Sequence, residues 1–328
     1  MKILTISLIN LLFSSVLVAQ SVSLSFSSNS TTKPVAVYES GEVQVKEVSG
    51  SLINTVAHTK PSSDPSFKTY GLANGSIIVR ENIANFVKYN VLGKTEWAIS
   101  NSTQSSGGES ISELATDPQA RTIVLYNPKV KSSGKDGSRA KVVGIGKNDG
   151  TTDIYYSADR IIRTVRVAES GEFIAIATGK AGADDEIVIV DRFGNQIQTI
   201  TFDQEVKGLN LYGSGSTLTV FSAGRVAVYS VMDGKRIASS SFRNGEVQFA
   251  NYSSSDQSII ALTGTVEGDL IKEGEVRIVN VAARKIASKE VAGALQFVNL
   301  DDITLNRTSR FTYRITGFDK DLRVNAKF

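Results

Sequence analysis

One pattern recurs from end to end of this chain: an apolar strand, a turn centred on glycine, and a second strand. Residues 187–197, Ile-Val-Ile-Val-Asp-Arg-Phe-Gly-Asn-Gln-Ile, give its clearest copy. Successive turns fall 43, 57, 44, 40, 49 and about 37 residues apart, which is the period of a repeated four-stranded sheet. This period predicts an all-β chain of seven units. The turns lie at Gly50, Gly93, Gly150, Gly194, Gly234, Ala283 and Asp319-Lys320.

The sequence between these turns favours strands over helices. No long window keeps the apolar spacing of an amphipathic helix between capping residues. Short β-branched and aromatic runs bounded by Gly, Ser, Asp and Asn occur instead, as at residues 121–126 and 216–221. One unit contains four such strands, named A to D in chain order, at residues 161–167, 172–178, 186–191 and 196–202.

The period, the strand order and the Asp/Gly turns resemble those of the β-propeller superfamily, among WD40-like and quinoprotein-like bacterial propellers. The resemblance covers residues 21–328. The Gly-His and Trp-Asp pairs of WD40 repeats are absent, because the chain has one histidine, His58, and one tryptophan, Trp97. The resemblance implies a seven-bladed β-propeller of four-stranded antiparallel blades, with residues 20–328 as one domain, and implies nothing about activity. Residues 21–26 are expected either to begin the first blade or to complete the last one.

The N-terminus has the pattern of a secretory signal peptide. Lys2 precedes a short apolar segment that ends in Leu-Val-Ala before Gln20, so residues 1–19 are expected to be removed. The rest of the chain contains no apolar run long enough for a transmembrane helix. The chain also contains no cysteine, which leaves no residue for disulfides or a lipid anchor. We therefore predict a secreted or periplasmic protein.

The C-terminus supports a rival architecture. Residues 322–328, Leu-Arg-Val-Asn-Ala-Lys-Phe, alternate between apolar and polar side chains, as in the last strand of an outer-membrane β-barrel. Continuous apolar runs such as residues 187–190 count against a barrel, because strands with lipid on one side and water on the other should alternate throughout. Aromatic residues are also only 8% of the chain. The barrel is therefore kept as an alternative to the propeller.

Few kinds of chemistry fit this composition. A formal net charge of +3 gives no electrostatic basis for binding nucleic acid. A single histidine and no cysteine exclude the usual zinc and copper ligand sets. His58, at a strand end before a Pro turn, is expected to be an ordinary surface or blade-edge residue. No catalytic residue and no cofactor are predicted, although residues 184–186, Asp-Asp-Glu, leave calcium as an alternative.

Three expanded B–C connections are expected to build up one face of the propeller. They span residues 128–138, 179–185 and 263–274, and the first and third would account for the long spacings of 57 and 49 residues. Loop insertions confined to one face often form a binding surface. The charged residues predicted to bind there, together with an arginine at the channel mouth, are Lys131, Lys135, Arg139, Arg163, Asp184, Asp185, Glu267 and Asp269.

These observations favour a non-catalytic scaffold that binds a protein or a surface glycan. Two alternatives stay open at this point. One is a propeller enzyme of the lactonase or carbohydrate-cleaving kind, dependent on carboxylates or calcium, and the other is the outer-membrane barrel. The sequence leaves the oligomeric state open.

Overall fold

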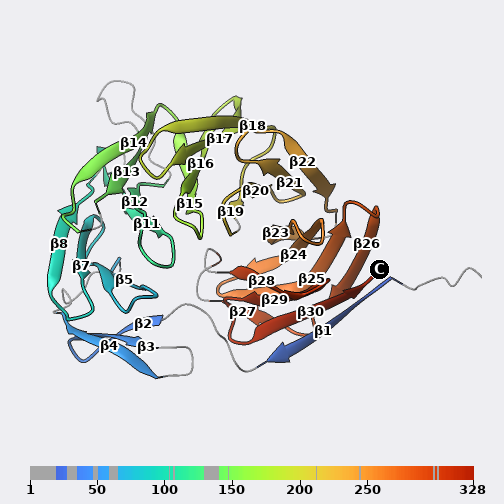
Figure 1. Cartoon of the computed structure of the whole chain (residues 1–328), viewed down its shortest axis with the longest axis horizontal. Helices are drawn as coiled ribbons and strands as arrows, with labels where there is room; N and C mark the ends of the chain where they lie inside the picture. Colours follow the sequence, from blue (N-terminus) through green and yellow to red (C-terminus); the bar gives the residue numbers. More distant parts are fainter. Residues whose placement is uncertain are drawn as a thin grey trace, which may run out of the picture.

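The computed structural model is an all-β ring of seven blades arranged in chain order (Figure 1). The predicted seven-bladed β-propeller is therefore confirmed. The predicted signal peptide, residues 1–19, lies outside the described residues. The structure describes residues 20–27, 35–46, 51–58, 66–102, 104–105, 108–128, 140–146, 148–211, 213–243, 245–297, 300 and 303–328.

Blades 2 to 6 each contain four antiparallel strands, with strand A nearest the centre of the ring. A short strand, β27 (Leu295–Gln296), also pairs with β25. Blade 2 contains β5 (Lys68–Gly71), β6 (Ile77–Arg80), β7 (Asn85–Tyr89) and β8 (Thr95–Ser100), and blade 3 contains β11 (Glu113–Thr116), β12 (Ile123–Tyr126), β13 (Ala140–Ile145) and β14 (Thr152–Ala158). Blade 4 contains β15 (Ile161–Val167), β16 (Phe173–Lys180), β17 (Ala183–Asp191) and β18 (Gln196–Phe202). Blade 5 contains β19 (Gly208–Leu211), β20 (Thr217–Phe221), β21 (Arg225–Ser230) and β22 (Arg236–Ser241), and blade 6 contains β23 (Glu246–Ser253), β24 (Ser258–Glu267), β25 (Leu270–Asn280) and β26 (Lys285–Glu290).

The N-terminal strand completes the last blade. Blade 7 takes its A, B and C strands from β28 (Thr304–Ser309), β29 (Thr312–Thr316) and β30 (Asp321–Lys327). Its outermost strand is β1 (Ser21–Ser27), which pairs with β30 along its whole length. Of the two positions expected for residues 21–26, the structure therefore has the second. The two ends of the chain are joined by hydrogen bonds within one sheet.

Blade 1 contains three strands among the described residues: β2 (Val35–Glu39), β3 (Glu42–Lys46) and β4 (Leu52–Ala57). The contacts of the C–D turns show which positions in the blade these three strands occupy. The C–D turn glycine of one blade packs on the D strand of the preceding blade, as Gly150 does on Trp97 of β8. Gly93 of blade 2 packs in the same way on Val56 of β4. Thus β4 is strand D, and the described part of blade 1 has no strand in the innermost position.

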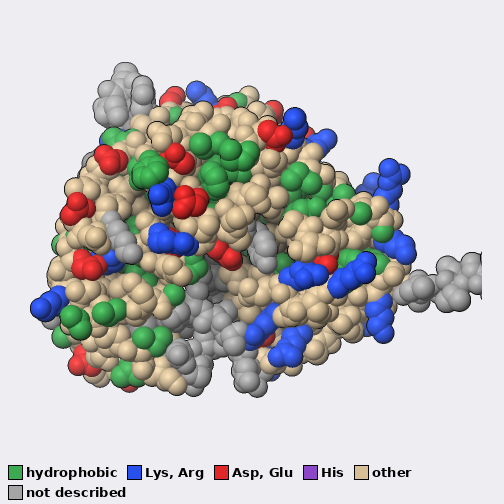
Figure 2. All heavy atoms as spheres, viewed as in Figure 1, with side chains coloured by type: hydrophobic (Ala, Val, Ile, Leu, Met, Phe, Trp, Pro, Cys, Tyr) green, Lys and Arg blue, Asp and Glu red, His purple; other side chains and the backbone are tan. Residues whose placement is uncertain are grey.

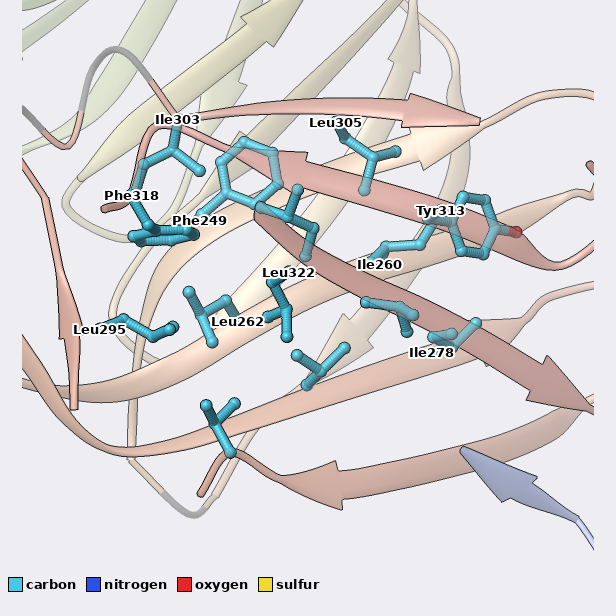
Figure 3. Close-up of a cluster of buried hydrophobic side chains, with 14 of the residues drawn as sticks. Phe249, Ile260, Leu262, Ile278, Leu295, Ile303, Leu305, Tyr313, Phe318 and Leu322 are labelled. Carbon is cyan, nitrogen blue, oxygen red and sulfur yellow. The ribbon is translucent and has the colours of Figure 1, made fainter. Parts of the chain in front are cut away.

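Among the described residues, the core is divided into six hydrophobic clusters, one between each pair of consecutive blades from 1 to 7. Alternate side chains of an apolar strand enter two different clusters. In β6, Ile77 and Val79 pack toward blade 1 whereas Ile78 packs toward blade 3. This two-sided burial is why the central strands have continuous apolar sequences. The cluster between blades 6 and 7 includes Phe249, Ile260, Leu305, Tyr313 and Leu322 (Figure 3).

The predicted glycine turns close the C–D hairpins. Gly194 has a φ of 84°, which glycine adopts without strain. A Cβ there would lie 2.5 Å from the ring of Tyr155 in the preceding blade. The glycine therefore serves both the turn and the close approach of two blades. Gly50 lies outside the described residues.

Three sequence-based expectations need correction. The alternative of one closed sheet is wrong, because hydrogen bonding divides the strands into separate sheets. Residues 179–185 and 263–274 are not long loops but hairpins, in which two-residue turns follow Lys180 and Glu267. Part of the 57-residue spacing comes from an insertion between blades 2 and 3, where β9 (Gln104–Ser105) pairs with β10 (Gly108–Glu109).

Candidate functional site

The face of the ring that carries the B–C turns and the D–A links, here called the BC face, holds a cluster of charged side chains on blade 4. The guanidinium of Arg163 in β15 lies 2.5 Å from Asp185 of β17 and 2.6 Å from Glu205. Asp185 is buried, and the carboxylate oxygen closest to the Arg163 guanidinium also accepts the Val206 N–H at 2.7 Å. Arg163 sits where the β15–β16 register shifts. Both charges of blade 4 are thus held by contacts with the link to blade 5, which contributes Glu205 and Val206.

A glycine in the neighbouring strand makes room for this arginine. A Cβ at Gly179 would lie 2.5 Å from the Arg163 guanidinium, so a side chain there would displace it. Arg160 is held next to this site by the Thr178 hydroxyl, at 2.9 Å, and by the Asp184 carbonyl, at 2.6 Å. The predicted residues Arg163 and Asp185 therefore come together, whereas the Asp184 side chain is exposed on the opposite side of β17.

The second described feature of the BC face is the hairpin of β24 and β25. Its strands stay paired up to Glu267 and Leu270. The Glu267 carboxylate pairs with Lys272, and Asp269 accepts a hydrogen bond from the Gln296 side chain at 2.7 Å. The short strand β27 pairs with β25 beside the tip. The predicted residues Glu267 and Asp269 therefore lie at an exposed hairpin tip that is braced by the following segment.

The remaining predicted residues, Lys131, Lys135 and Arg139, lie outside the described residues. The five that are described lie at two separate places on the BC face, the blade 4 cluster and the β24–β25 tip. Glu205 and Arg160 complete the blade 4 cluster. The sequence contains no indication of Glu205, and it places Arg160 near the channel mouth without including it among the predicted binding residues. The Arg-x-x-Arg pattern of residues 160–163, at the start of strand A, was one indication of the blade 4 cluster. The register shift at Arg163 was not predictable from the sequence.

A cavity of about 260 Å³ lies between the inner strands of blades 4, 5 and 6. Its walls combine apolar side chains such as Leu209 and Phe249 with polar ones such as Asn210 and Gln248. Lys207, which pairs with Glu246, lines the part toward the BC face. The volume is below the usual range of ligand pockets, so the cavity has room only for a small molecule.

The acidic side chains of residues 184–186 do not converge on a common point. Asp185 turns toward Arg163, and the neighbouring Glu186 lies 3.2 Å from Arg160. In the described part of the chain, no three His, Asp or Glu side chains gather as metal ligands would. Calcium binding by residues 184–186 stays an untested alternative to the prediction of no cofactor.

His58 was expected to be a surface or blade-edge residue, and the structure contradicts the surface position. It is 5% exposed, and its Nδ1 lies 2.8 Å from the Tyr89 hydroxyl of blade 2. Burial lowers its pKa, and the Glu81 carboxylate at 3.8 Å opposes this effect. His58 therefore belongs to the packing between blades 1 and 2.

Within the described ranges, no helix is long and apolar enough to span a membrane.

Comparisons with known proteins establish the fold. No protein-family profile and no curated protein sequence matches the chain. Among solved structures, it is similar to a eukaryotic initiation factor, with a TM-score of 0.55 and 13% identity over 79% of this chain and 63% of that one. The chain thus spans less than two thirds of that structure. It is also similar to the β-propeller domain of Cps50 (Swd1) from Myceliophteria thermophila, with a TM-score of 0.54 and 11% identity over 92% of this chain and 98% of that one. The chain is a seven-bladed β-propeller.

Proposed function

We propose that this protein is a non-catalytic scaffold that binds a protein partner on its BC face. The main support is that the β16–β17 and β24–β25 hairpins lie on this face with their charges already held in place. Arg163 is fixed by Asp185, and Asp269 is fixed by Gln296. Groups that are ordered before binding lose less conformational entropy on association. The partly exposed Val266 adds an apolar contact at the β24–β25 tip.

Export is part of this proposal. The signal-like residues 1–19 would direct the chain to the periplasm or the medium. N-terminal sequencing of the protein isolated from its source cells tests this step. A mature chain that begins at Gln20 is expected, and a chain that retains Met1 would contradict export by cleavage.

Lysine-specific cross-linking in the source cells tests the binding face. Lys207 and Lys272 are exposed on the BC face, whereas Lys94 and Lys235 lie at C–D turns on the opposite face. We expect cross-links to partner proteins from the first pair. Cross-links confined to the second pair would refute the proposed face.

A pair of matched variants makes the test quantitative. Val266 lies at the β24–β25 tip and is 37% exposed, and Met232 lies at a C–D turn and is 65% exposed. Val266→Asp should reduce the yield of cross-linked partner, and Met232→Asp should leave it unchanged. Equal yields from the two variants would contradict a role for the hairpin tip.

A further inference from the structure

Blade 7 has one sheet face that no other blade covers within the part of the chain that the structure describes. In β30, Leu322, Val324 and Ala326 are buried whereas Arg323, Asn325 and Lys327 are exposed. The pairing of β1 with β30 continues this alternation, because Ser21 and Ser25 lie opposite Lys327 and Arg323. We call this surface the outer face of blade 7. It consists of Ser21, Ser23, Ser25, Thr312, Arg314, Arg323, Asn325 and Lys327.

This one-sided burial of strand C distinguishes blade 7 from blades 4 and 5. Strand C of those two blades is buried on both faces, at residues 187–190 of β17 and 226–229 of β21. Hydrophobic clusters link consecutive blades from 1 to 7, and among the described residues none links blade 7 to blade 1. Strand β3 places Glu42 and Gln44 on the side of blade 1 that faces away from blade 2. The outer face of blade 7 is therefore exposed at Ser21, Ser23 and Ser25 of β1 and at Arg323, Asn325 and Lys327 of β30.

The outer face carries positive charge. Arg314 is paired with the buried Asp321, which leaves its charge compensated. Arg323 lies directly opposite Arg314 in the strand register, an arrangement in which like charges destabilise a sheet. Arg323 and Lys327 form no ion pair with the other described residues. Figure 2 shows Lys and Arg side chains gathered over the region where Figure 1 places β28, β30 and β1.

We propose that the outer face of blade 7 binds an extended, acidic segment of a protein partner. Arg323 and Lys327 are four residues apart on one strand, so their Cα atoms are separated by about 13 Å. Carboxylates four residues apart in an extended peptide have the same spacing. Between the two cations, Asn325 and the serines of β1 offer hydrogen-bonding groups to a peptide backbone. The face has no aromatic side chain on which a sugar ring would stack, so its chemistry favours a peptide over a glycan.

A fluorescence anisotropy titration of the full chain with labelled peptides tests this proposal. One peptide carries glutamates four residues apart among Ser and Thr, and a second has the same composition with its glutamates adjacent. We expect the first peptide to bind more tightly. Equal affinity for both would overturn the proposed spacing, and no binding of either would overturn the site.

Charge-reversal variants locate the binding. Arg323→Glu/Lys327→Glu should weaken binding of the spaced peptide by about tenfold. Lys94→Glu/Lys141→Glu makes the same charge change on exposed positions of blades 2 and 3 and should alter binding by less than about twofold. Equal losses in the two variants would show a non-specific charge effect and overturn the proposal. Both variants should keep the wild-type far-UV circular dichroism, because the four positions are exposed.

Other occupants of the face give distinct results. Vesicles containing an anionic phospholipid and the acidic polysaccharide polygalacturonate are tested as competitors of the spaced peptide. If either binds more tightly and loses affinity in Arg323→Glu/Lys327→Glu, the peptide assignment is overturned. Sedimentation of the protein alone covers the remaining case, because a dimer that this variant dissociates would assign the face to a second copy of the chain. The site lies apart from the BC face, so its failure would leave the proposed function untouched.

Discussion

Replacing Asp256 with alanine should weaken the contact between blades 6 and 7. Asp256 lies in the turn between β23 and β24, and its side chain is 1% exposed. Its carboxylate accepts hydrogen bonds from Arg307 Nε at 2.8 Å and Nη2 at 2.9 Å. It also accepts the Phe311 N–H at 3.1 Å and the Tyr313 hydroxyl at 2.9 Å. All four donors belong to blade 7, so one carboxylate joins the two blades.

The expected loss follows from the donors that alanine would leave without an acceptor. Tyr313 is fully buried, and an unsatisfied buried donor destabilises the folded state by about 1–3 kcal/mol. The Phe311 N–H loses its acceptor in the same way. The Arg307 side chain is 31% exposed, so water replaces much of its lost partner. We therefore expect Asp256→Ala to lower the free energy of unfolding by about 3 kcal/mol.

Urea unfolding followed by far-UV circular dichroism measures this loss. Tyr313→Phe removes only one donor and should lower the free energy of unfolding by about 1 kcal/mol. Because Asp256→Ala already breaks that hydrogen bond, the double variant should be no less stable than Asp256→Ala alone. Asp233→Ala is the control, since that carboxylate sits in an exposed turn. A loss below about 1 kcal/mol for Asp256→Ala, or strict additivity in the cycle, would refute this account of the contact.

Three further perturbations test other parts of the fold. Burial acts to raise the pKa of Asp256, but the hydrogen bonds described above outweigh it and hold that pKa below its ordinary value. The carboxylate therefore contributes stability above about pH 4 and loses that contribution as the pH falls through its folded-state pKa. When the pH is lowered, the free energy of unfolding should decrease less for Asp256→Asn than for the wild type. In Gly194→Ala, the new Cβ clashes with a neighbouring atom at 2.5 Å, in addition to the strain of a positive φ. In Gly182→Ala, φ is also positive, but no atom lies within 4 Å of the new Cβ. Thermal unfolding should therefore show the larger decrease in Tm for Gly194→Ala. Val22→Asp places a carboxylate in the core and should lower the free energy of unfolding by about 3 kcal/mol, whereas Ser23→Asp on the exposed side of β1 should have little effect; equal effects would contradict the orientation of β1.

The architecture was predictable because the same local constraint recurs in successive blades. A C–D turn next to the preceding blade requires a residue that tolerates positive φ and that lacks a bulky side chain. Gly150 and Gly194 meet both requirements, and their closest neighbours are Trp97 and Tyr155. Repetition of this requirement gives the regular spacing from which the number of blades was inferred. The position of β1 was not predictable, because Ser-Val-Ser-Leu-Ser-Phe alternates equally well in an inner or an outer strand.

The candidate site was predictable only in part. Gly268-Asp269 between alternating residues is a hairpin signal, and greater weight on it would have predicted the β24–β25 hairpin in place of a loop. Asp256 gave no such signal, because its Ser-Asp-Gln context is that of an ordinary exposed turn. Its partners are 51 to 57 residues later in the sequence. Only the folded ring brings these residues together.

The alternation of apolar and polar residues at the C-terminus, which suggested an outer-membrane barrel, also has a physical explanation in the propeller. A strand alternates between apolar and polar residues when only one of its faces is buried. Residues 322–328 have this pattern because the inner side of β30 packs on blade 6 and its outer side is exposed. In blades 4 and 5, which have a neighbour on both sides, strand C is apolar and buried on both faces at residues 187–190 and 226–229. The pattern that resembled a membrane strand therefore reflects the exposure of the outer face of blade 7. This is the surface on which we place the acidic partner segment.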